Sequence, residues 1–195
     1  NLEDSNYTNN SINIAIQAAK IRKEDKILEI GSGGGRYTYL LIKRGFKVSC
    51  MDLLPSLIKR LKTNLLDSPY LLNTYVQDLC SKELKVKDRF DVVIGIYVLH
   101  HFEDFQSAFS NIYKLLNNGG RLVFIEPNPW NLPTWFNFLI DHNLTFKGEK
   151  GTLKIMKKYV TNLMKSCGFK NVIFKRIFFL PPPFVNFPLG QKIDD

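Results

Sequence analysis

The chain has 195 residues, of which 45% are hydrophobic and 23% charged, and its formal net charge is +9 at pH 7. This size and composition are typical of one globular domain with a sizeable core. No run approaches 18 consecutive apolar residues, so we expect no membrane-spanning helix. The first ten residues are polar and lack the apolar core of a signal peptide.

Three isolated cysteines, Cys50, Cys80 and Cys167, are odd in number and lack the spacing of metal ligands. We interpret them as reduced thiols and therefore expect a cytoplasmic protein. The three histidines do not combine with cysteines or carboxylates in a zinc pattern, so we expect no metal site.

The first predicted element is an amphipathic helix over residues 11–21, because Ile12, Ala15, Ile16 and Ala19 recur near helical spacing. The stretch 26–36 then reads Lys-Ile-Leu-Glu-Ile-Gly-Ser-Gly-Gly-Gly-Arg. Its apolar start predicts a buried strand, and its glycines predict a sharp turn that allows close approach of another group. A strand, a glycine turn and a helix N-terminus together can form a nucleotide site, and the alternative is that the glycines make only a tight connection between strand and helix.

A helix over 37–44 and a strand over 46–51 follow, and Asp52 ends that strand 21 residues after Gly31. A carboxylate at this position of a βαβ unit can accept both ribose hydroxyls of an adenosine. The alternative is that Asp52 is the N-cap of the helix predicted over 57–66. Pro55 would suit the first turn of that helix. A short strand over 73–76 then leads to Asp78, which could also be a solvent-facing turn residue.

The stretch 91–97 is nearly continuously apolar, which predicts a central parallel strand buried on both faces. Tyr97-Val-Leu-His-His-Phe102 follows it. A histidine here could take a proton from an acceptor hydroxyl, because its pKa is ordinarily near neutral. The alternative for His100 or His101 is a ring that bonds a loop carbonyl or packs on a ligand.

The next elements are a helix over 104–116, ended by Asn-Asn-Gly-Gly, and a strand over 121–126. The run 127–139 is rich in aromatic residues, so Trp130 and Trp135 form either the wall of an acceptor pocket or an ordinary packed helix.

A helix over 154–167 and a sixth strand over 171–179 complete the predicted elements, and a proline-rich tail follows them. Residues 147–176 carry +8 of the net charge, which is either a solvated face or a surface for anionic lipid or a phosphorylated substrate.

Residues 28–35, Leu-Glu-Ile-Gly-Ser-Gly-Gly-Gly, resemble the first motif of the class I S-adenosylmethionine-dependent methyltransferases, in which an acidic residue stands two before the first glycine. Glu29 fills that position. The resemblance covers about residues 27–126 and extends to Asp52, Asp78 and the segment 97–102 in family order. The chain is also similar to the small-molecule members of the family, including those of quinone biosynthesis.

This resemblance implies a Rossmann-like α/β fold, with a doubly wound and mostly parallel sheet and helices on both faces. The family's seventh, antiparallel strand has no candidate before Asp195, so we expect it to be missing from this sequence. The implied organisation is a single domain over 1–195, with a helical cap at 1–25, a cofactor-binding core at 26–126 and an acceptor-side segment at 127–195.

The implied cofactor is S-adenosylmethionine, which would leave as S-adenosylhomocysteine. The amino-acid end would lie against the glycine loop, Asp52 would bind the ribose and Asp78 the adenine amine. The cofactor-binding residues expected on this basis are Glu29, Gly31, Ser32, Gly33, Gly35, Asp52, Leu53, Asp78, Leu79 and Tyr97.

The implied reaction is direct methyl transfer to a small-molecule acceptor, and the aromatic and basic segments are consistent with a lipid-like or anionic acceptor. The basic stretch Lys147–Arg176 is also a candidate for contact with a membrane surface. DNA amino-group or cytosine motifs and an RNA-binding motif are absent, so we expect no nucleic-acid partner. Two alternatives stay open. A nicotinamide-dependent oxidoreductase shares Asp52 but would need Gly or Ala where Arg36 stands. A non-catalytic module that binds the same cofactor is the other.

Overall fold

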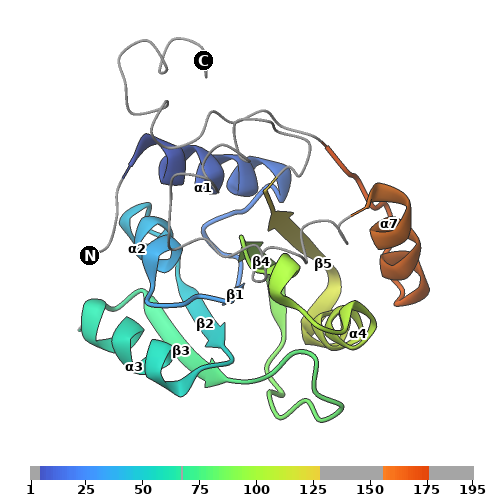
Figure 1. Ribbon diagram of the computed structural model, residues 1–195. Helices are drawn as coiled ribbons and strands as arrows, with labels where there is room; N and C mark the ends of the chain where they lie inside the picture. The colour runs from blue at the N-terminus through green and yellow to red at the C-terminus, as the bar shows by residue number, and fades with distance from the viewer. Residues whose placement is uncertain (1–4, 67, 128–155, 176–195) are drawn as a thin grey trace, which may run out of the picture.

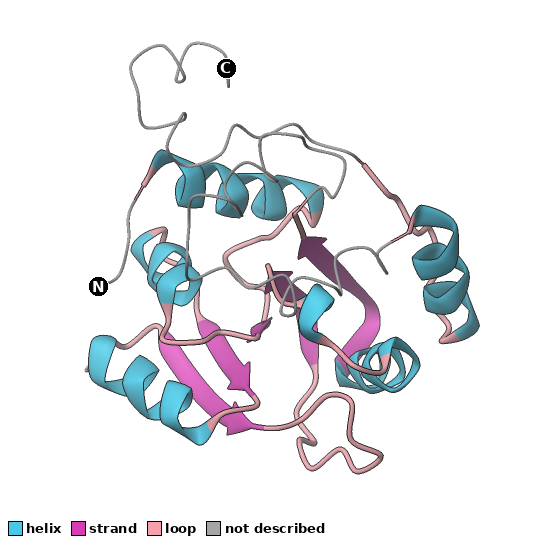
Figure 2. Ribbon diagram, viewed as in Figure 1, coloured by secondary structure: helices cyan, strands magenta, loops and turns pink. Residues whose placement is uncertain are grey.

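The computed structural model describes residues 5–66, 68–127 and 156–175. Five strands form one sheet in the order β3-β2-β1-β4-β5, and every neighbouring pair is parallel. The strands are β1 (Ile27–Ile30), β2 (Val48–Asp52), β3 (Leu71–Val76), β4 (Phe90–Ile96) and β5 (Leu116–Ile125). Figures 1 and 2 show them fanning through the middle of the molecule. The predicted α/β class with a doubly wound sheet is therefore confirmed.

Helices cover both faces of this sheet, which is why β1 and β2 are buried along their whole length. The helices are α1 (Asn6–Ala18), α2 (Arg36–Lys43), α3 (Pro55–Asn64), α4 (Phe105–Leu115) and α7 (Lys157–Ser166), with a 3-10 turn, η1, at Leu99–His101. One core lies under α1, α2 and α3, and the other lies under α4 and α7. Figure 1 shows α4 and α7 together on the side away from α2 and α3.

The two cores are built by alternate residues of the same strands, because successive side chains of a strand point to opposite faces. Ile27 of β1 and Val92 of β4 belong to the core under α1 and α2. Leu28 of β1 and Val93 of β4 belong to the core under α4. Each central strand thus contributes apolar side chains to both helix layers.

The helix α1 begins five residues before the predicted start at residue 11 and ends at Ala18. Its start is fixed by a capping box in which the Ser5 side chain accepts from the Thr8 backbone N–H, and the Thr8 hydroxyl accepts from the Ser5 N–H at 3.0 Å. Its far end is held by Arg121 of β5, which donates to the carbonyls of Ala19 and Lys20 at 3.0 and 2.7 Å. The helix is therefore fastened at both ends.

The predicted turn at residues 117–120 lies inside β5 instead of before it. Leu116 pairs with Phe90 and Arg121 pairs with Val92, so four residues of β5 oppose a single residue of β4. This is a large bulge, and Gly119 adopts a φ of +75° within it. The helix α4 ends at Leu115, where Leu116 is already extended, so the chain enters the sheet before it reaches the glycines that were expected to end the helix.

The sixth strand predicted over 171–179 is wrong where the structure describes it, because residues 171–175 belong to no strand. Phe174 instead packs against the core on the α4 side. Residues 176–179 of that prediction lie outside the described residues, as do Trp130, Trp135 and the proline-rich tail. Among the helices that the structure describes, none is long and apolar enough to cross a membrane.

Candidate functional site

The loop between β1 and α2 folds back against the end of β2. Ser32 donates its backbone N–H to the Met51 carbonyl at 3.1 Å, and Gly33 donates its backbone N–H to the Asp52 carboxylate at 2.8 Å. Gly31, Gly33 and Gly35 have φ values of +64°, +53° and +92°, a region that side-chain-bearing residues rarely adopt. Glycine is thus required here for conformation alone.

These glycines differ in how close a Cβ atom at each position would lie to neighbouring atoms. A Cβ at Gly31 would lie 2.1 Å from a methyl carbon of Val98, and one at Gly35 would lie 3.2 Å from Leu61. Both glycines therefore allow close packing within the protein. At Gly33 the same construction meets no atom within 4 Å. The loop consequently leaves open space at Gly33, beside the Asp52 carboxylate, which is the cradle that a ligand edge needs.

Asp52 ends β2 with its side chain turned toward this loop, and it is only 8% exposed. Its second carboxylate oxygen accepts from the Leu54 backbone N–H at 3.0 Å. Leu54, not Asp52, is the N-cap residue of α3, and Pro55 occupies the first helical turn. A carboxylate offers about four lone-pair positions, so Asp52 retains capacity for further donors. Leu53 beside it is 58% exposed and provides an apolar surface.

Beyond the end of β3 lie two of the predicted site residues, in different environments. Asp78 is exposed, and its carboxylate accepts from the Cys80 backbone N–H at 2.8 Å. Leu79 is 5% exposed and belongs to the core on the α4 side. Because Asp52 pairs with Val76 in the parallel sheet, the ends of β2 and β3 are level, and Asp78 follows at the same edge as Asp52.

Glu29 is a fully buried carboxylate within the central strand. The Thr38 hydroxyl of α2 donates to it at 2.6 Å and also lies 3.4 Å from the Cys50 sulfur. Burial raises the pKa of Glu29 to about 8, the Thr38 hydrogen bond opposes this rise, and the charge of Asp52 adds to it. At neutral pH Glu29 is therefore largely protonated in this state of the protein.

The residue after β4, Tyr97, has a φ of +53°, which is strained for a tyrosine. Its hydroxyl donates to the Tyr7 hydroxyl at 2.7 Å and lies 3.0 Å from the Ser11 hydroxyl, both on α1. The rings of Tyr7 and Tyr97 stack at 5.9 Å, and Tyr37 of α2 meets Tyr97 edge-on at 6.2 Å. Three tyrosines from three elements thus gather at the end of β4.

The following turn carries the two candidate histidines. His100 is 5% exposed, and its Nδ1 lies 2.6 Å from an oxygen of Glu126, the residue that follows β5. His101 is exposed, and its ring centroid lies 3.9 Å from that of His100. The other Glu126 oxygen accepts from the backbone N–H groups of Val98 and Leu99 at 3.0 and 2.7 Å.

The structure brings most of the predicted site residues to one edge of the sheet, because all the strands run parallel and end there. Leu79 lies at the same edge but differs from the other predicted site residues because its side chain is buried in the core. Sequence reasoning left out two residues, Tyr7 and Glu126. Their partners are 90 and 26 residues away in the chain, and no local pattern signals such contacts.

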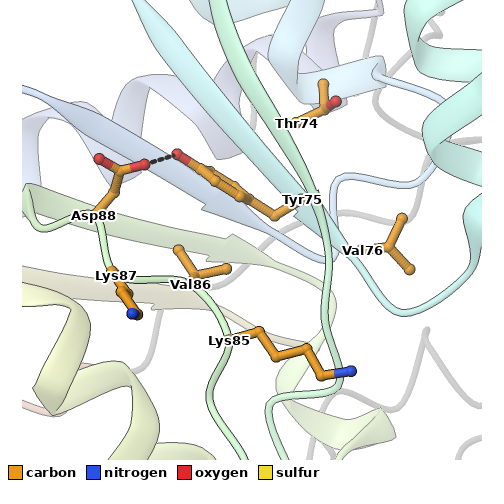
Figure 3. Close-up of a pocket in the computed structure, with 7 residues that line it drawn as sticks. All are labelled: Thr74, Tyr75, Val76, Lys85, Val86, Lys87 and Asp88. Atoms are coloured by element: carbon orange, nitrogen blue, oxygen red, sulfur yellow. Dashed lines mark hydrogen bonds between the residues drawn. The ribbon is translucent and has the colours of Figure 1, made fainter.

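A separate open hollow of about 590 Å³ lies at the edge strand β3, between that strand and the segment 85–88. Figure 3 shows Tyr75 pointing at Asp88, to which its hydroxyl donates at 2.5 Å, with Lys85 and Lys87 at the rim. None of the predicted site residues lines this hollow.

Within residues 5–66, 68–127 and 156–175, no group of three His, Cys, Asp or Glu side chains is placed to hold a metal ion. Cys50, Cys80 and Cys167 are all free thiols, as predicted.

Comparison with known proteins identifies a family that shares this sequence pattern. A family model described as a methyltransferase domain matches residues 28–124, about half of the chain. A malonyl-[acyl-carrier protein] O-methyltransferase of Ilyobacter polytropus is 29% identical over 105 residues, covering 53% of this chain and 38% of that protein. A ubiquinone biosynthesis O-methyltransferase of Coxiella burnetii is 33% identical over 108 residues, covering 54% and 45%. The chain thus spans less than half the length of these curated relatives.

Among solved structures, an N-methyltransferase of Haemonchus contortus, in complex with phosphomonomethylethanolamine and S-adenosylhomocysteine, superposes with a TM-score of 0.61. The match covers 84% of this chain and 37% of that one at 18% identity. At this identity the likeness concerns the fold.

Proposed function

The chain belongs to the class I S-adenosylmethionine-dependent methyltransferases, and we propose that it transfers a methyl group from S-adenosylmethionine to a small-molecule acceptor. The observation that carries the proposal is the cradle at the ends of β1 and β2. There a glycine loop leaves space at Gly33, and its backbone is bonded to the Asp52 carboxylate. Open space next to a held carboxylate suits an adenosine whose ribose presents two hydroxyls.

The residues at this edge fit the cofactor in charge and shape. Asp52 would accept the ribose hydroxyls, Asp78 would accept the adenine amine, and Leu53 would contact the apolar faces of adenosine. Glu29 lies beneath the loop at the amino-acid end. S-adenosylmethionine carries a sulfonium and an ammonium, and the carboxylates of Asp52 and Asp78 at the same edge complement this positive charge.

When bound, the cofactor supplies a methyl group that is already attached to a good leaving group. The chain's own residues have to bind both reactants and align them, which can supply much of the acceleration. The segment 97–102 after β4 would lie between cofactor and acceptor. A base at His100 or His101 is needed only when the acceptor is poorly ionised.

We propose an acceptor with lipid-like or anionic character, in line with the curated relatives, whose names refer to ubiquinone biosynthesis and to malonyl-[acyl-carrier protein]. The apolar wall predicted at Trp130 and Trp135 lies outside the described residues and stays a prediction. The cytoplasmic location inferred from the free thiols is likewise a proposal.

A second surface property supports contact with anionic membranes. Residues 156–175 contain five lysines and no acidic residue. Three large apolar side chains are also exposed there: Met156, Tyr159 and Ile173 at 65%, 54% and 78%. Cationic and apolar side chains together are what an anionic lipid surface attracts.

Two measurements test the proposed function. In calorimetry with the intact chain, S-adenosylhomocysteine should bind and NADH should not, because Arg36 stands where a dinucleotide fingerprint needs Gly or Ala. Transfer of a labelled methyl group to a panel of phenols, carboxylic acids, amines and quinols should then identify the acceptor class. Binding of NADH alone would favour the oxidoreductase. Tight binding of S-adenosylhomocysteine without turnover on any acceptor would favour a non-catalytic module.

A further inference from the structure

The strand β3 is the outer edge of the sheet, and its free side has no strand partner among the described residues. Gln77, which follows β3, donates its backbone N–H to the Asp52 carbonyl of β2 at 3.1 Å. Because the N–H and C=O groups of a strand alternate in direction along the chain, those of Thr74 and Val76 point away from β2. An unpaired strand edge of this kind is a template for another extended chain.

The hollow of about 590 Å³ lies beside this part of the edge, between β3 and the segment 85–88. Contacts at its two ends hold the segment away from the strand. At one end the buried side chain of Gln77 accepts from the Lys85 backbone N–H at 2.9 Å. At the other end Tyr75 donates its hydroxyl to Asp88 at 2.5 Å, as Figure 3 shows. The hollow is therefore held open by the fold itself, which lowers the cost of binding a ligand there.

Positive charge flanks the free edge on both faces of the sheet. Leu84 and Val86 pack against the core under α4 and α7. Lys85 and Lys87 alternate with them and are exposed at the rim of the hollow (Figure 3). Neither of these ammonium groups forms an ion pair with another described residue. On the opposite face, α3 contains three basic residues and no acidic one. The edge is thus complementary to a negatively charged partner.

The groups along the edge favour a peptide over a simple anion or a second copy of this chain. A small anion would meet the carbonyl oxygens of the edge and the Asp88 carboxylate, which repel it. Two copies paired about a two-fold axis through β3 would bring their Lys85 and Lys87 side chains together, and like charges on neighbouring strands are destabilising. An extended acidic peptide offers N–H and C=O groups to the edge and carboxylates to the lysines.

We propose that the free edge of β3 and the adjoining hollow bind an extended acidic segment of a partner protein as an added strand. Tyr75 points to the α4 side of the sheet, so side chains of the segment on that side lie beside Lys85 and Lys87. Val76 points to the other side and is 50% exposed, so an apolar side chain of the segment can cover it. The preferred sequence therefore alternates acidic and apolar residues. The interaction uses none of the residues assigned to S-adenosylmethionine.

The primary test is NMR of the nitrogen-labelled full chain with an acetylated hexapeptide amide of sequence Glu-Val-Glu-Val-Glu-Val. The amide signals of Thr74 and Val76 should move when the peptide is added. At a peptide concentration about ten times the Kd, hydrogen exchange of these two amides should slow about tenfold, because only the free fraction exchanges. No movement of either signal with about 1 mM peptide would overturn the proposal.

A modified peptide separates strand pairing from charge attraction. The same hexapeptide, N-methylated at its central amides, keeps its three carboxylates but cannot donate to the carbonyl groups of the edge. It should bind at least about tenfold more weakly than the parent peptide, because a strand pairs through its backbone. Equal binding of the two peptides would show that no strand is added and would overturn the proposal.

The double variant Lys85→Glu/Lys87→Glu tests the charge complementarity. Its affinity for the glutamate peptide, measured by fluorescence anisotropy, should fall at least about tenfold, because attraction becomes repulsion. It should instead gain affinity for the peptide Lys-Val-Lys-Val-Lys-Val. The matched control is Lys157→Glu/Lys158→Glu on α7, which Figure 1 shows on the other side of the molecule from β3. The control should bind the glutamate peptide within about twofold of the parent chain. Equal losses in the two double variants would assign the attraction to net charge and overturn the site.

The variant Val76→Pro tests the backbone contact, because proline lacks the N–H that points to the free edge and is tolerated on edge strands. It should keep the circular dichroism of the parent chain and lose about tenfold in affinity for the glutamate peptide. Thr74→Val, which keeps its backbone N–H, is the control and should bind as the parent does. The lysine variants decide the question if Val76→Pro does not fold.

Two competing occupants are tested directly. Displacement of the glutamate peptide by a single-stranded oligothymidylate would indicate a general cationic patch and overturn the proposal. A dimer in analytical ultracentrifugation that Val76→Pro converts to a monomer would show that a second copy of this chain occupies the edge, and would also overturn it. The expected result is a parent chain that stays monomeric and binds the peptide in the presence of the oligonucleotide.

Discussion

Gly33 combines a positive φ of +53° with open space where its Cβ would be, whereas its neighbours Gly31 and Gly35 are packed against Val98 and Leu61. Substitution at the neighbours would therefore damage the fold and the site together. At Gly33 the strain of a left-handed residue is the only internal cost, about 1–2 kcal/mol. The position thus allows ligand binding to be separated from stability.

We predict that Gly33→Val abolishes binding of S-adenosylhomocysteine in calorimetry while the protein stays folded, because the side chain fills the cradle. The matched control is Gly119→Val in the β5 bulge, where φ is +75° and a Cβ again meets nothing within 4 Å. Both variants should lose similar stability in chemical denaturation, but only Gly33→Val should lose the ligand. Unchanged affinity in folded Gly33→Val would contradict the assignment of the cradle.

The site residues that the sequence predicted are those whose positions follow from short local patterns. The glycine turn, Glu29 in the strand before it and Asp52 at the tip of β2 all follow from short patterns, and each lies at the expected strand end. Glu126 and Tyr7 could not be found in this way, because their roles depend on partners in other elements. Nor does a pattern show that Leu79 is turned into the core.

Helix and strand positions were predicted well where a buried apolar run sets them, and less well where a cap or a bulge does. The start of α1 was missed because Ser5 and Thr8 form the capping box with a threonine where glutamate or glutamine is usual. The sixth strand was predicted from alternation alone. Its described part, residues 171–175, follows α7 without joining the sheet.

We expect the surface formed by α7 and the segment after it to bind anionic membranes. Each lysine near an anionic surface contributes about 1 kcal/mol, so the double variant Lys158→Glu/Lys165→Glu should greatly weaken sedimentation with phosphatidylserine-rich vesicles. Vesicles of pure phosphatidylcholine should not bind the protein, and high salt should release it. Lys59→Glu/Lys62→Glu on the equally basic α3 is the control. If the two double variants behave alike, the attraction is due to net charge and no α7 surface exists.

At the scale of the whole molecule, Glu29 makes stability depend on pH. Its native pKa of about 8 lies above the ordinary 4.5, so between these values the folded protein holds a proton that the unfolded chain has released. The free energy of unfolding should therefore be highest below about pH 5 as far as this group is concerned, and should fall as pH rises toward 8. The slope approaches about 1.4 kcal/mol per pH unit at most.

Glu29→Gln should remove this contribution, because an amide can still accept from Thr38 but does not titrate. The measurement is urea denaturation of the variant and the parent chain from pH 5 to 8, with the exposed Glu24→Gln as control. The difference between Glu29→Gln and the parent should grow with pH in favour of the variant. Parallel curves would mean that Glu29 is ionised in the folded protein.

The central place of β1 has a consequence for the newly made chain. β1 is completed by residue 30, yet one of its two neighbours is β4, which begins only at Phe90. Until ribosomes have added about sixty more residues, the backbone edge of this largely apolar strand has no partner on that side. The amino-terminal strands β1 to β3 therefore lack one neighbour in the sheet until β4 is made. The hydrogen bond from Arg121 to the carbonyl at the end of α1 can form only later still. During this interval the unpaired edge of β1 can associate with other chains, so we expect aggregation to be favoured before β4 is made.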